Sequence, residues 1–99
     1  MKSITQLNVI AKEWFDKING NSYFSARINV NKDTFYLPLQ YGYDSAYIQA
    51  TSALLKAHGF NIGDNWNIEK FCKDNNIPAT FHKYEKCLKK EVKAWGIIG

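Results

Sequence analysis

Apolar and polar residues alternate along three segments near the start of the chain. The clearest alternation runs from Tyr23 to Val30, where every second side chain is apolar. A period of two places successive side chains on opposite faces of a strand, so one face is buried and the other is not. Strands are expected at about residues 7–17, 23–30 and 34–40. Pro38 cannot donate a hydrogen bond to a neighbouring strand, so the third strand should form an edge of the sheet.

The first of these segments also has a helical interpretation. Over residues 3–18 its apolar positions recur at spacings of three and four as well as two. Asn19-Gly20 favours the strand, because this dipeptide is the strongest two-residue signal for a β-hairpin and a clear strand follows it. We therefore expect a strand at about 7–17 that pairs with the next one, with a helix as the alternative.

The strongest helical pattern runs from about Asp44 to His58. Its apolar and small residues recur at spacings of three and four and therefore share one face. The residues expected on that face are Tyr47, Ala50, Thr51, Leu54 and Ala57 or His58. Asp44 and Ser45 can accept hydrogen bonds from the N–H groups of the first turn, and Gly59 suits a left-handed C-terminal cap.

The rest of the chain predicts shorter elements. Asn67 can cap a short helix over Ile68–Asp74, and Pro78 disfavours helix at the residue before it. Residues 79–86 indicate a strand, and residues 88–95 fit either a strand or a short helix. The sequence thus predicts one α+β domain, residues 1–99: a small antiparallel sheet of three to four strands, with the helix at about 44–58 on one face and a short second helix.

Composition narrows the class of protein. The 99 residues are 45% apolar, which excludes a disordered chain, and no run of about 18 apolar residues predicts a membrane span. The N-terminus does not resemble a signal peptide, so we expect a cytoplasmic protein without a membrane partner. Cys72 and Cys87 are then expected to be free thiols. Together with His58 and His82 they lack the close spacing of a metal site, and no metal or cofactor is predicted.

Motifs for catalysis are missing from the sequence. No serine lies in a G-x-S-x-G segment, and no glycine-rich loop precedes a helix as in phosphate-binding sites. His58 falls on the buried side or at the end of the main helix, where packing is a commoner role than acid–base chemistry. His82 has no carboxylate at a fixed spacing. We therefore expect a protein that is not an enzyme.

Outward-facing aromatic residues on the sheet suggest a first binding surface. Tyr23 and Arg27 should point outward from the second strand, and Tyr36 from the third. If Asn31 and Thr34 flank a two-residue turn, Arg27 lies diagonally across from Tyr36. Such a face either stacks the bases of a single-stranded nucleic acid or forms a cross-strand cation–π pair.

Tyr41 and Tyr43 lie where the third strand leads into the main helix. They alternate across one glycine, so at least one of them should be exposed. Exposed tyrosines beside a rigid turn are good anchors for a protein partner. The full set of predicted partner-binding residues is Tyr23, Arg27, Tyr36, Tyr41 and Tyr43.

Positive charge is concentrated in the last third of the chain. The net charge is +4, of which residues 65–99 carry +3 and residues 1–64 carry +1. Twelve lysines stand against one arginine, and this disfavours base recognition, for which arginine is the usual residue. Weak, charge-driven binding of DNA or RNA is the alternative function. Its candidate residues are Lys83, Lys86, Lys89, Lys90 and Lys93.

Two segments carry a resemblance to a known group of proteins. Residues 14–23, WFDKINGNSY, and residues 40–47, QYGYDSAY, are similar to W-F-D-K-x-x-G-N-[ST]-Y and Y-G-Y-x-x-x-Y stretches of small uncharacterised proteins of tailed bacteriophages. Residues 88–96 resemble a basic segment near the C-terminus of these proteins. The pattern favours glycine where this chain has Asp44. The resemblance implies a phage origin and a strand at the first segment, and it implies no activity.

The expected function is that of a small non-catalytic interaction protein. It would bind a host protein or ribonucleoprotein in the host cytoplasm and inhibit or redirect it. A defence system such as a CRISPR effector is one such partner, since small phage proteins without catalytic motifs often counter host defence. A homo-oligomer is compatible with the sequence.

Overall fold

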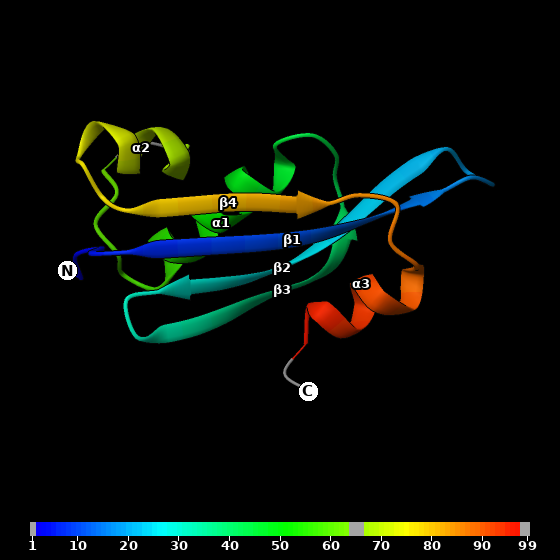
Figure 1. The fold of residues 1–99 in the computed structure, drawn as a ribbon, viewed down its shortest axis with the longest axis horizontal. Helices are drawn as coiled ribbons and strands as arrows, with labels where there is room; N and C mark the ends of the chain where they lie inside the picture. The colour runs from blue at the N-terminus through cyan, green and yellow to red at the C-terminus, as the bar shows by residue number, and fades with distance from the viewer. Residues whose placement is uncertain (1, 64–66, 98–99) are drawn as a thin grey trace.

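The computed structural model of the protein describes residues 2–63 and 67–97, which form one sheet and three helices (Figure 1). The strands are β1 (Leu7–Asp16), β2 (Asn21–Val30), β3 (Asp33–Tyr41) and β4 (Ala79–Tyr84). The helices are α1 (Ala46–Ala57), α2 (Ile68–Asp74) and α3 (Lys89–Trp95). The fold is α+β, as the sequence predicts.

The four strands form a mixed sheet in the order β3-β2-β1-β4. β1 pairs antiparallel with β2 and β2 with β3, whereas β4 pairs parallel to β1. The prediction of an antiparallel sheet is therefore wrong for β4. The reason is the long connection through α1 and α2, which returns the chain to the end of the sheet where β1 begins, as a crossover to a parallel strand does.

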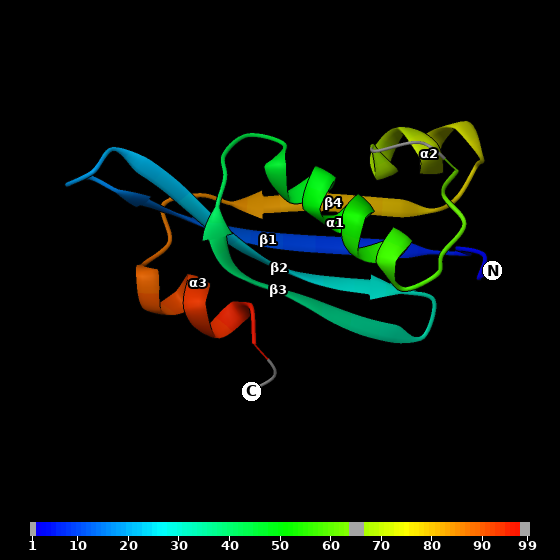
Figure 2. The ribbon, with the colours of Figure 1, turned by 180° about the vertical axis from the view of Figure 1, so that it is seen from behind.

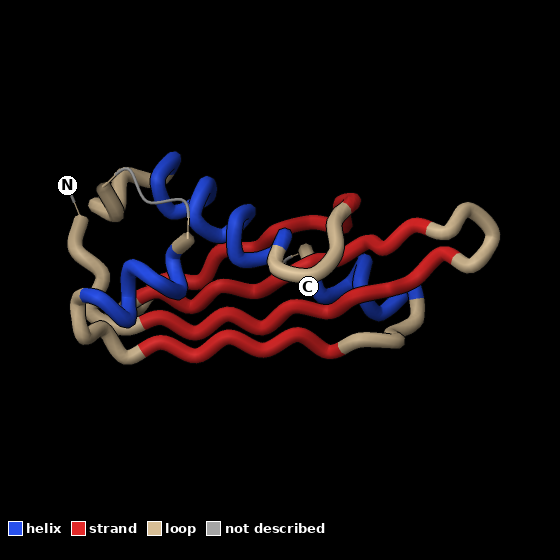
Figure 3. Tube along the Cα trace, turned by 90° about the horizontal axis from the view of Figure 1, so that it is seen from above, coloured by secondary structure: helices blue, strands red, loops and turns tan. Residues whose placement is uncertain are grey.

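β1 and β2 form a long hairpin that projects beyond the other strands (Figure 3). The strand interpretation of the first segment is thus confirmed over Leu7–Asp16. The loop has four residues rather than two, because Asp16 pairs with Asn21. The Asp16 carboxylate accepts hydrogen bonds from the backbone N–H of Ile18 at 3.0 Å and from the Asn19 side-chain amide at 2.8 Å. The Asn19 bond is the main reason that the pKa of Asp16 is lowered.

Gly20 closes this loop with a backbone φ of +70° and donates its N–H to the Asp16 carbonyl at 2.7 Å. We expect Gly20→Val to lower the free energy of unfolding by about 1 kcal/mol or more, since a β-branched residue resists positive φ. A Cβ at this position has open space around it, so the cost is that of the backbone alone. Chemical denaturation measures the change. The exposed loop residue Lys17→Val is the matched control, and equal stability of the two variants would contradict the prediction.

α1 and α2 cover the face of the sheet that we call the inner face (Figure 2). The inner-face residues of the strands are fully or almost fully buried there: Leu7, Val9, Ala11, Phe24, Ala26, Ile28 and Val30. α2 is capped as predicted, with the Asn67 side chain accepting from the Lys70 N–H at 3.1 Å. Its Ile68 and Cys72 side chains complete the core, and burial raises the pKa of the Cys72 thiol.

α1 is rotated relative to the predicted stripe. Its buried residues are Tyr47, Ile48, Thr51, Ser52 and Leu55, so two of the predicted positions are confirmed, Ala50 and Leu54 are half-buried, and Ala57 and His58 are exposed. The buried face of α1 also includes Ile48 and Leu55, and it carries a polar contact at Ser52. The Ser52 hydroxyl donates to the Ile48 carbonyl at 3.0 Å and accepts from the Ile68 N–H at 2.9 Å, which joins α1 to the start of α2. A pattern that counts serine as a surface residue misses this contact.

The predicted cap at the N-terminal end of α1 is wrong, and the predicted cap at its C-terminal end is confirmed. Ser45 is the N-cap residue but its side chain makes no capping hydrogen bond, and Asp44 lies outside the helix with a φ of +53°. At the other end Gly59 adopts a φ of +85° and donates to the Lys56 carbonyl, and the Phe60 N–H reaches Leu55. These two bonds form the predicted left-handed cap.

β3 lies at a border of the sheet, as Pro38 predicts. The pairing of β2 with β3 shifts between Phe24 and Ala26, whose partners are Gln40 and Leu37. Pro38 therefore falls in a bulge, where its missing N–H costs no hydrogen bond between β2 and β3.

α3 packs on the opposite face of the sheet, which we call the outer face (Figure 1). The Trp95 carbonyl accepts from Arg27 Nε at 3.0 Å, and the Trp95 indole donates to the Ile10 carbonyl at 2.8 Å. Ser25 is fully buried and donates its hydroxyl to the Val92 carbonyl. The expectation that this face meets solvent is therefore wrong at Ser25, whereas Arg27 is half-buried. Alternation along a strand identifies two faces but does not say whether a later helix covers the second.

Candidate functional site

Four aromatic side chains form a continuous row at the end of the outer face nearest the β1–β2 loop. We call this row the aromatic ladder. The Trp14 and Tyr23 rings stack with centroids 5.5 Å apart, and Tyr23 meets Tyr41 edge to face at 5.9 Å. Tyr41 in turn meets Tyr43 edge to face at 6.4 Å. The ladder therefore crosses β1, β2 and β3 and continues onto the segment that leads into α1.

The strand register places these rings side by side. Trp14 is the partner of Tyr23 across the hairpin, and Tyr23 is the partner of Tyr41. Side chains of paired residues on one face of a sheet are in contact distance, so each ring supports the next. The ladder thus rests on paired strands over most of its length, and its geometry does not depend on a long loop.

The free end of the ladder is exposed. Tyr41 and Tyr43 are 60% and 59% exposed. Three further large apolar side chains at this end of the protein also face solvent: Phe15, Ile18 and Leu88. Scattered exposed apolar residues are ordinary, but several together at one end of a small domain are typical of an interaction surface.

Lysine side chains border the ladder on the side of α3. The Lys89 Nζ lies 5.2 Å from the centre of the Trp14 ring, a cation–π contact. Lys86, Lys90 and Lys93 are exposed on the same segment. Lys83 is different, because its side chain is only 13% exposed and its Nζ lies 3.3 Å from Glu13 Oε1 and 3.0 Å from the Asp44 carbonyl. Of the predicted lysine set, Lys83 is therefore held within the fold.

Arg27 and Tyr36 lie outside the ladder. They are direct partners across β2 and β3, so the predicted diagonal arrangement is wrong: the turn begins one residue earlier, with Val30 paired to Asp33. The Arg27 guanidinium lies 5.5 Å from the Tyr36 ring and 4.0 Å from the Trp95 ring. The structure thus brings together Tyr23, Tyr41 and Tyr43 from the predicted set, while Arg27 anchors α3.

Trp14 is the ladder residue that was not predicted as a binding residue. Its position also fits the apolar stripe of the alternative helix over residues 3–18. The strand alternation contained the missing signal, since Trp14 falls on the same face as Lys12, opposite to the core residues Val9 and Ala11. A tryptophan on the outer face directly across a hairpin from a tyrosine predicts a stacked pair.

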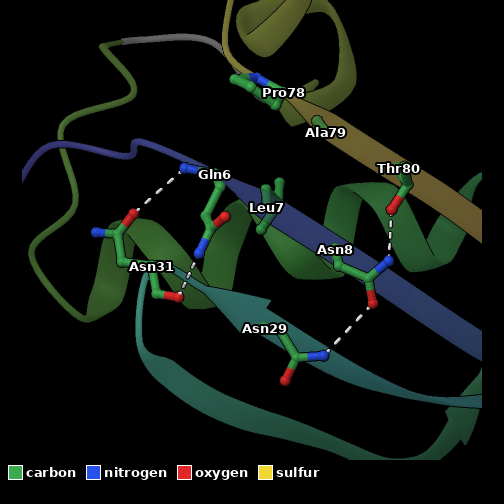
Figure 4. Close-up of a pocket in the computed structure, with 8 residues that line it drawn as sticks. All are labelled: Gln6, Leu7, Asn8, Asn29, Asn31, Pro78, Ala79 and Thr80. Atoms are coloured by element: carbon green, nitrogen blue, oxygen red, sulfur yellow. Dashed lines mark hydrogen bonds between the residues drawn. The ribbon is translucent and has the colours of Figure 1, made fainter.

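A shallow polar depression of about 290 Å³ lies at the other end of the outer face (Figure 4). Hydrogen bonds cross all four strands there in one direction: Thr34 donates to Asn29, Asn29 to Asn8, and Asn8 to Thr80. Asn31 ties the neighbouring loop together through its contacts with Thr5 and Gln6. Among the described residues, those that line the depression are polar or apolar and carry no charged group.

A second hollow, of about 420 Å³, lies between α3 and β4 and is lined in part by Lys12, Glu91 and Trp95. Its ionic groups already have structural partners. The Glu91 carboxylate accepts from the Leu88 N–H at 3.1 Å, and the Lys12 Nζ lies 4.6 Å from the Trp95 ring. Cys87, also in the lining, is a free thiol.

The two histidines use their rings for packing. The His58 ring packs at a tilt against the Phe35 ring with centroids 4.3 Å apart, and the His82 ring meets the Tyr84 ring edge to face at the same distance. Within residues 2–63 and 67–97, no three histidine, cysteine or acidic side chains gather as metal ligands do. Over the same ranges, none of the helices is both long and apolar enough to cross a membrane.

Comparisons of the chain with models of protein families, with curated proteins and with solved structures each found no match.

Proposed function

We propose that this chain is a small non-catalytic interaction protein that binds a macromolecular partner through the aromatic ladder. The observation that carries the proposal is the exposure of Tyr41 and Tyr43 at the end of a row of rings fixed by strand pairing. Tyrosine and tryptophan supply most of the energy of many protein interfaces, and a ring that is already held in place loses little side-chain entropy on binding.

A protein partner suits the ladder better than a nucleic acid. Base stacking needs an open ring face, but the Trp14 ring already contacts the Tyr23 ring and the Lys89 ammonium group. The sole arginine of the chain is likewise engaged, between two rings and a backbone carbonyl. The exposed apolar residues at the same end of the protein are the kind of surface that a protein covers.

The resemblance to small proteins of tailed bacteriophages suggests where the partner is found. A phage-encoded protein meets its partners in the host cytoplasm, and the proposed partner is a host protein or ribonucleoprotein whose activity is inhibited or redirected. A CRISPR effector is a partner of this class. No catalytic step and no cofactor enter this proposal.

Affinity capture from a bacterial host lysate, with and without nuclease, tests the proposed function. We expect the wild-type chain to retain a protein that survives nuclease treatment, and Tyr41→Ala combined with Tyr43→Ala to lose it. Tyr84→Ala is the matched control, because Tyr84 is 51% exposed but lies on β4. Loss of all captured protein on nuclease treatment, or equal capture by the ladder variant, would contradict the proposal.

Binding of DNA or RNA is the second candidate, favoured by the exposed lysines of the α3 segment. We expect such binding to be weak and to fall steeply with added salt, since contacts to phosphates release counterions. Removing Lys89, Lys90 and Lys93 together should flatten the slope of log affinity against log salt by about three units. Fluorescence anisotropy with an oligonucleotide measures this. Tight, sequence-selective binding that persists at high salt would instead promote nucleic acid to the principal partner.

A further inference from the structure

The two borders of the sheet differ in how they are protected against further pairing. β3 carries Pro38 in a bulge, and both features disfavour the approach of another strand. β4 forms the other border and spans Ala79–Tyr84 without a proline and with an unbroken register to β1. Figure 1 shows β4 at the margin of the sheet. The border at β4 is thus the one suited to pairing.

The register identifies the backbone groups that face this open border. The Leu7 N–H donates to the Pro78 carbonyl at 3.0 Å, and Leu7 is the partner of Ala79. Because of this bond, the backbone N–H and C=O groups of Thr80 and His82 point toward β1 in the parallel strand pair. The backbone groups of every second residue, between and beside them, point away from β1. The outward residues are Ala79, Phe81 and Lys83. Within the part of the chain that the structure describes, their outward groups have no backbone partner.

Lysine side chains often guard an exposed border, but Lys83 does not do so here. Its ammonium group turns to Glu13 at 3.3 Å and to Glu85 at 3.8 Å. The positive charge is neutralised within the fold, so it does not repel a strand that approaches β4.

We propose that β4 pairs antiparallel with β4 of a second copy of this chain, about a two-fold axis at Phe81. In this register Phe81 lies opposite the partner's Phe81, and Ala79 lies opposite the partner's Lys83. Each outward N–H then meets an outward C=O, because these residues are spaced symmetrically about Phe81. The two sheets become one continuous sheet.

The side chains fit this pairing on both faces. On the inner face Phe81 is only half-buried in one copy and gains the partner's ring as a neighbour. On the outer face Thr80 lies opposite the partner's His82, so no like charges face each other. The row of side-chain hydrogen bonds ends at Thr80 on β4 (Figure 4), so in the dimer it reaches the strand next to the two-fold axis.

The aromatic ladder stays uncovered in this dimer. It lies over the outer face of β1, β2 and β3 and does not involve β4. The assembly therefore presents two identical ladders and would bind a repeated or dimeric partner with avidity. The dimer itself does not rest on the proposed function, since pairing at β4 is measured without any partner.

Sedimentation equilibrium over a series of concentrations tests the dimer. We expect the wild-type chain to dimerise and Ala79→Pro to raise the dissociation constant by about tenfold or more, since proline removes an outward N–H donor. That N–H has no intramolecular role, so the variant should fold normally. Circular dichroism verifies this. A wild-type chain that remains monomeric throughout, or dimers equally stable in Ala79→Pro, would overturn the proposal.

Disulfide cross-linking tests the register without relying on that variant. Thr80 and the partner's His82 would form a non-hydrogen-bonded pair with Cα atoms about 4.5 Å apart, which suits a disulfide. We expect Thr80→Cys and His82→Cys chains, both carrying Cys87→Ser, to cross-link on mixing but not separately. Thr34→Cys, on the outer face at the opposite border, is the matched control. Absence of the mixed product, or an equal yield with Thr34→Cys, would overturn the register. A partner peptide on β4 would instead leave the chain monomeric.

Discussion

Gly96→Val should lower the free energy of unfolding by about 2 to 3 kcal/mol, the cost of overpacking a well-packed contact. Gly96 follows α3 and is buried against β2 and β3. A Cβ there would lie 2.5 Å from the Leu37 carbonyl oxygen and 2.8 Å from both Pro38 Cα and Ser25 Cβ. Two of these three neighbours are backbone atoms, so the clash cannot be relieved by a rotamer change.

The same substitution should loosen α3 as a unit. Moving residue 96 away from the sheet also moves Trp95, which holds the Arg27 side chain through its carbonyl and the Ile10 carbonyl through its indole. Urea denaturation followed by tryptophan fluorescence measures the loss. Ala94→Val is the matched control, because Ala94 is exposed on the same helix. If the two valine variants were equally stable, the packing of α3 on the outer face would be wrong.

The sequence could predict the inner half of this fold in detail. Alternation in β2 identified Phe24, Ala26, Ile28 and Val30 as core, and Pro38 identified β3 as a border. These signals are local, since each depends on one residue type or on a period of two.

The outer face could not be predicted in the same way. Whether Ser25 and Arg27 are covered depends on a helix that begins more than sixty residues later along the chain. The parallel direction of β4 likewise depends on the path of the connection rather than on the composition of the strand. Both depend on contacts between residues far apart in the sequence, which the spacing of apolar residues does not reveal.

The candidate site was likewise predictable from the sequence only in part. Tyr41 and Tyr43 are exposed at the strand-to-helix junction, as their positions suggested. Their contact with Tyr23 and Trp14 follows from the register of three strands, and a two-residue turn expected one residue too late was enough to misplace Arg27 against Tyr36. A binding surface built across strands becomes visible only when the register is known.

Tyr41→Ala and Tyr43→Ala should each reduce the affinity for the partner by about 30-fold, or about 2 kcal/mol. Both side chains are more than half exposed, so we expect the free energy of unfolding to change by less than about 1 kcal/mol. Trp14→Ala should weaken binding as well, but with a larger loss of stability, because Trp14 is half-buried and supports Tyr23. Truncating an anchor residue lowers the affinity for the partner but not the free energy of unfolding, whereas truncating a core residue lowers the free energy of unfolding.

Titration calorimetry of the captured partner with Tyr41→Ala, Tyr43→Ala and the control Tyr84→Ala, alongside denaturation of the same three proteins, tests the ladder most directly. The account predicts that the two ladder variants remain folded and lose about 30-fold in affinity, while Tyr84→Ala binds as the wild type does. Ladder variants that bind at wild-type strength, or that both unfold, would contradict it.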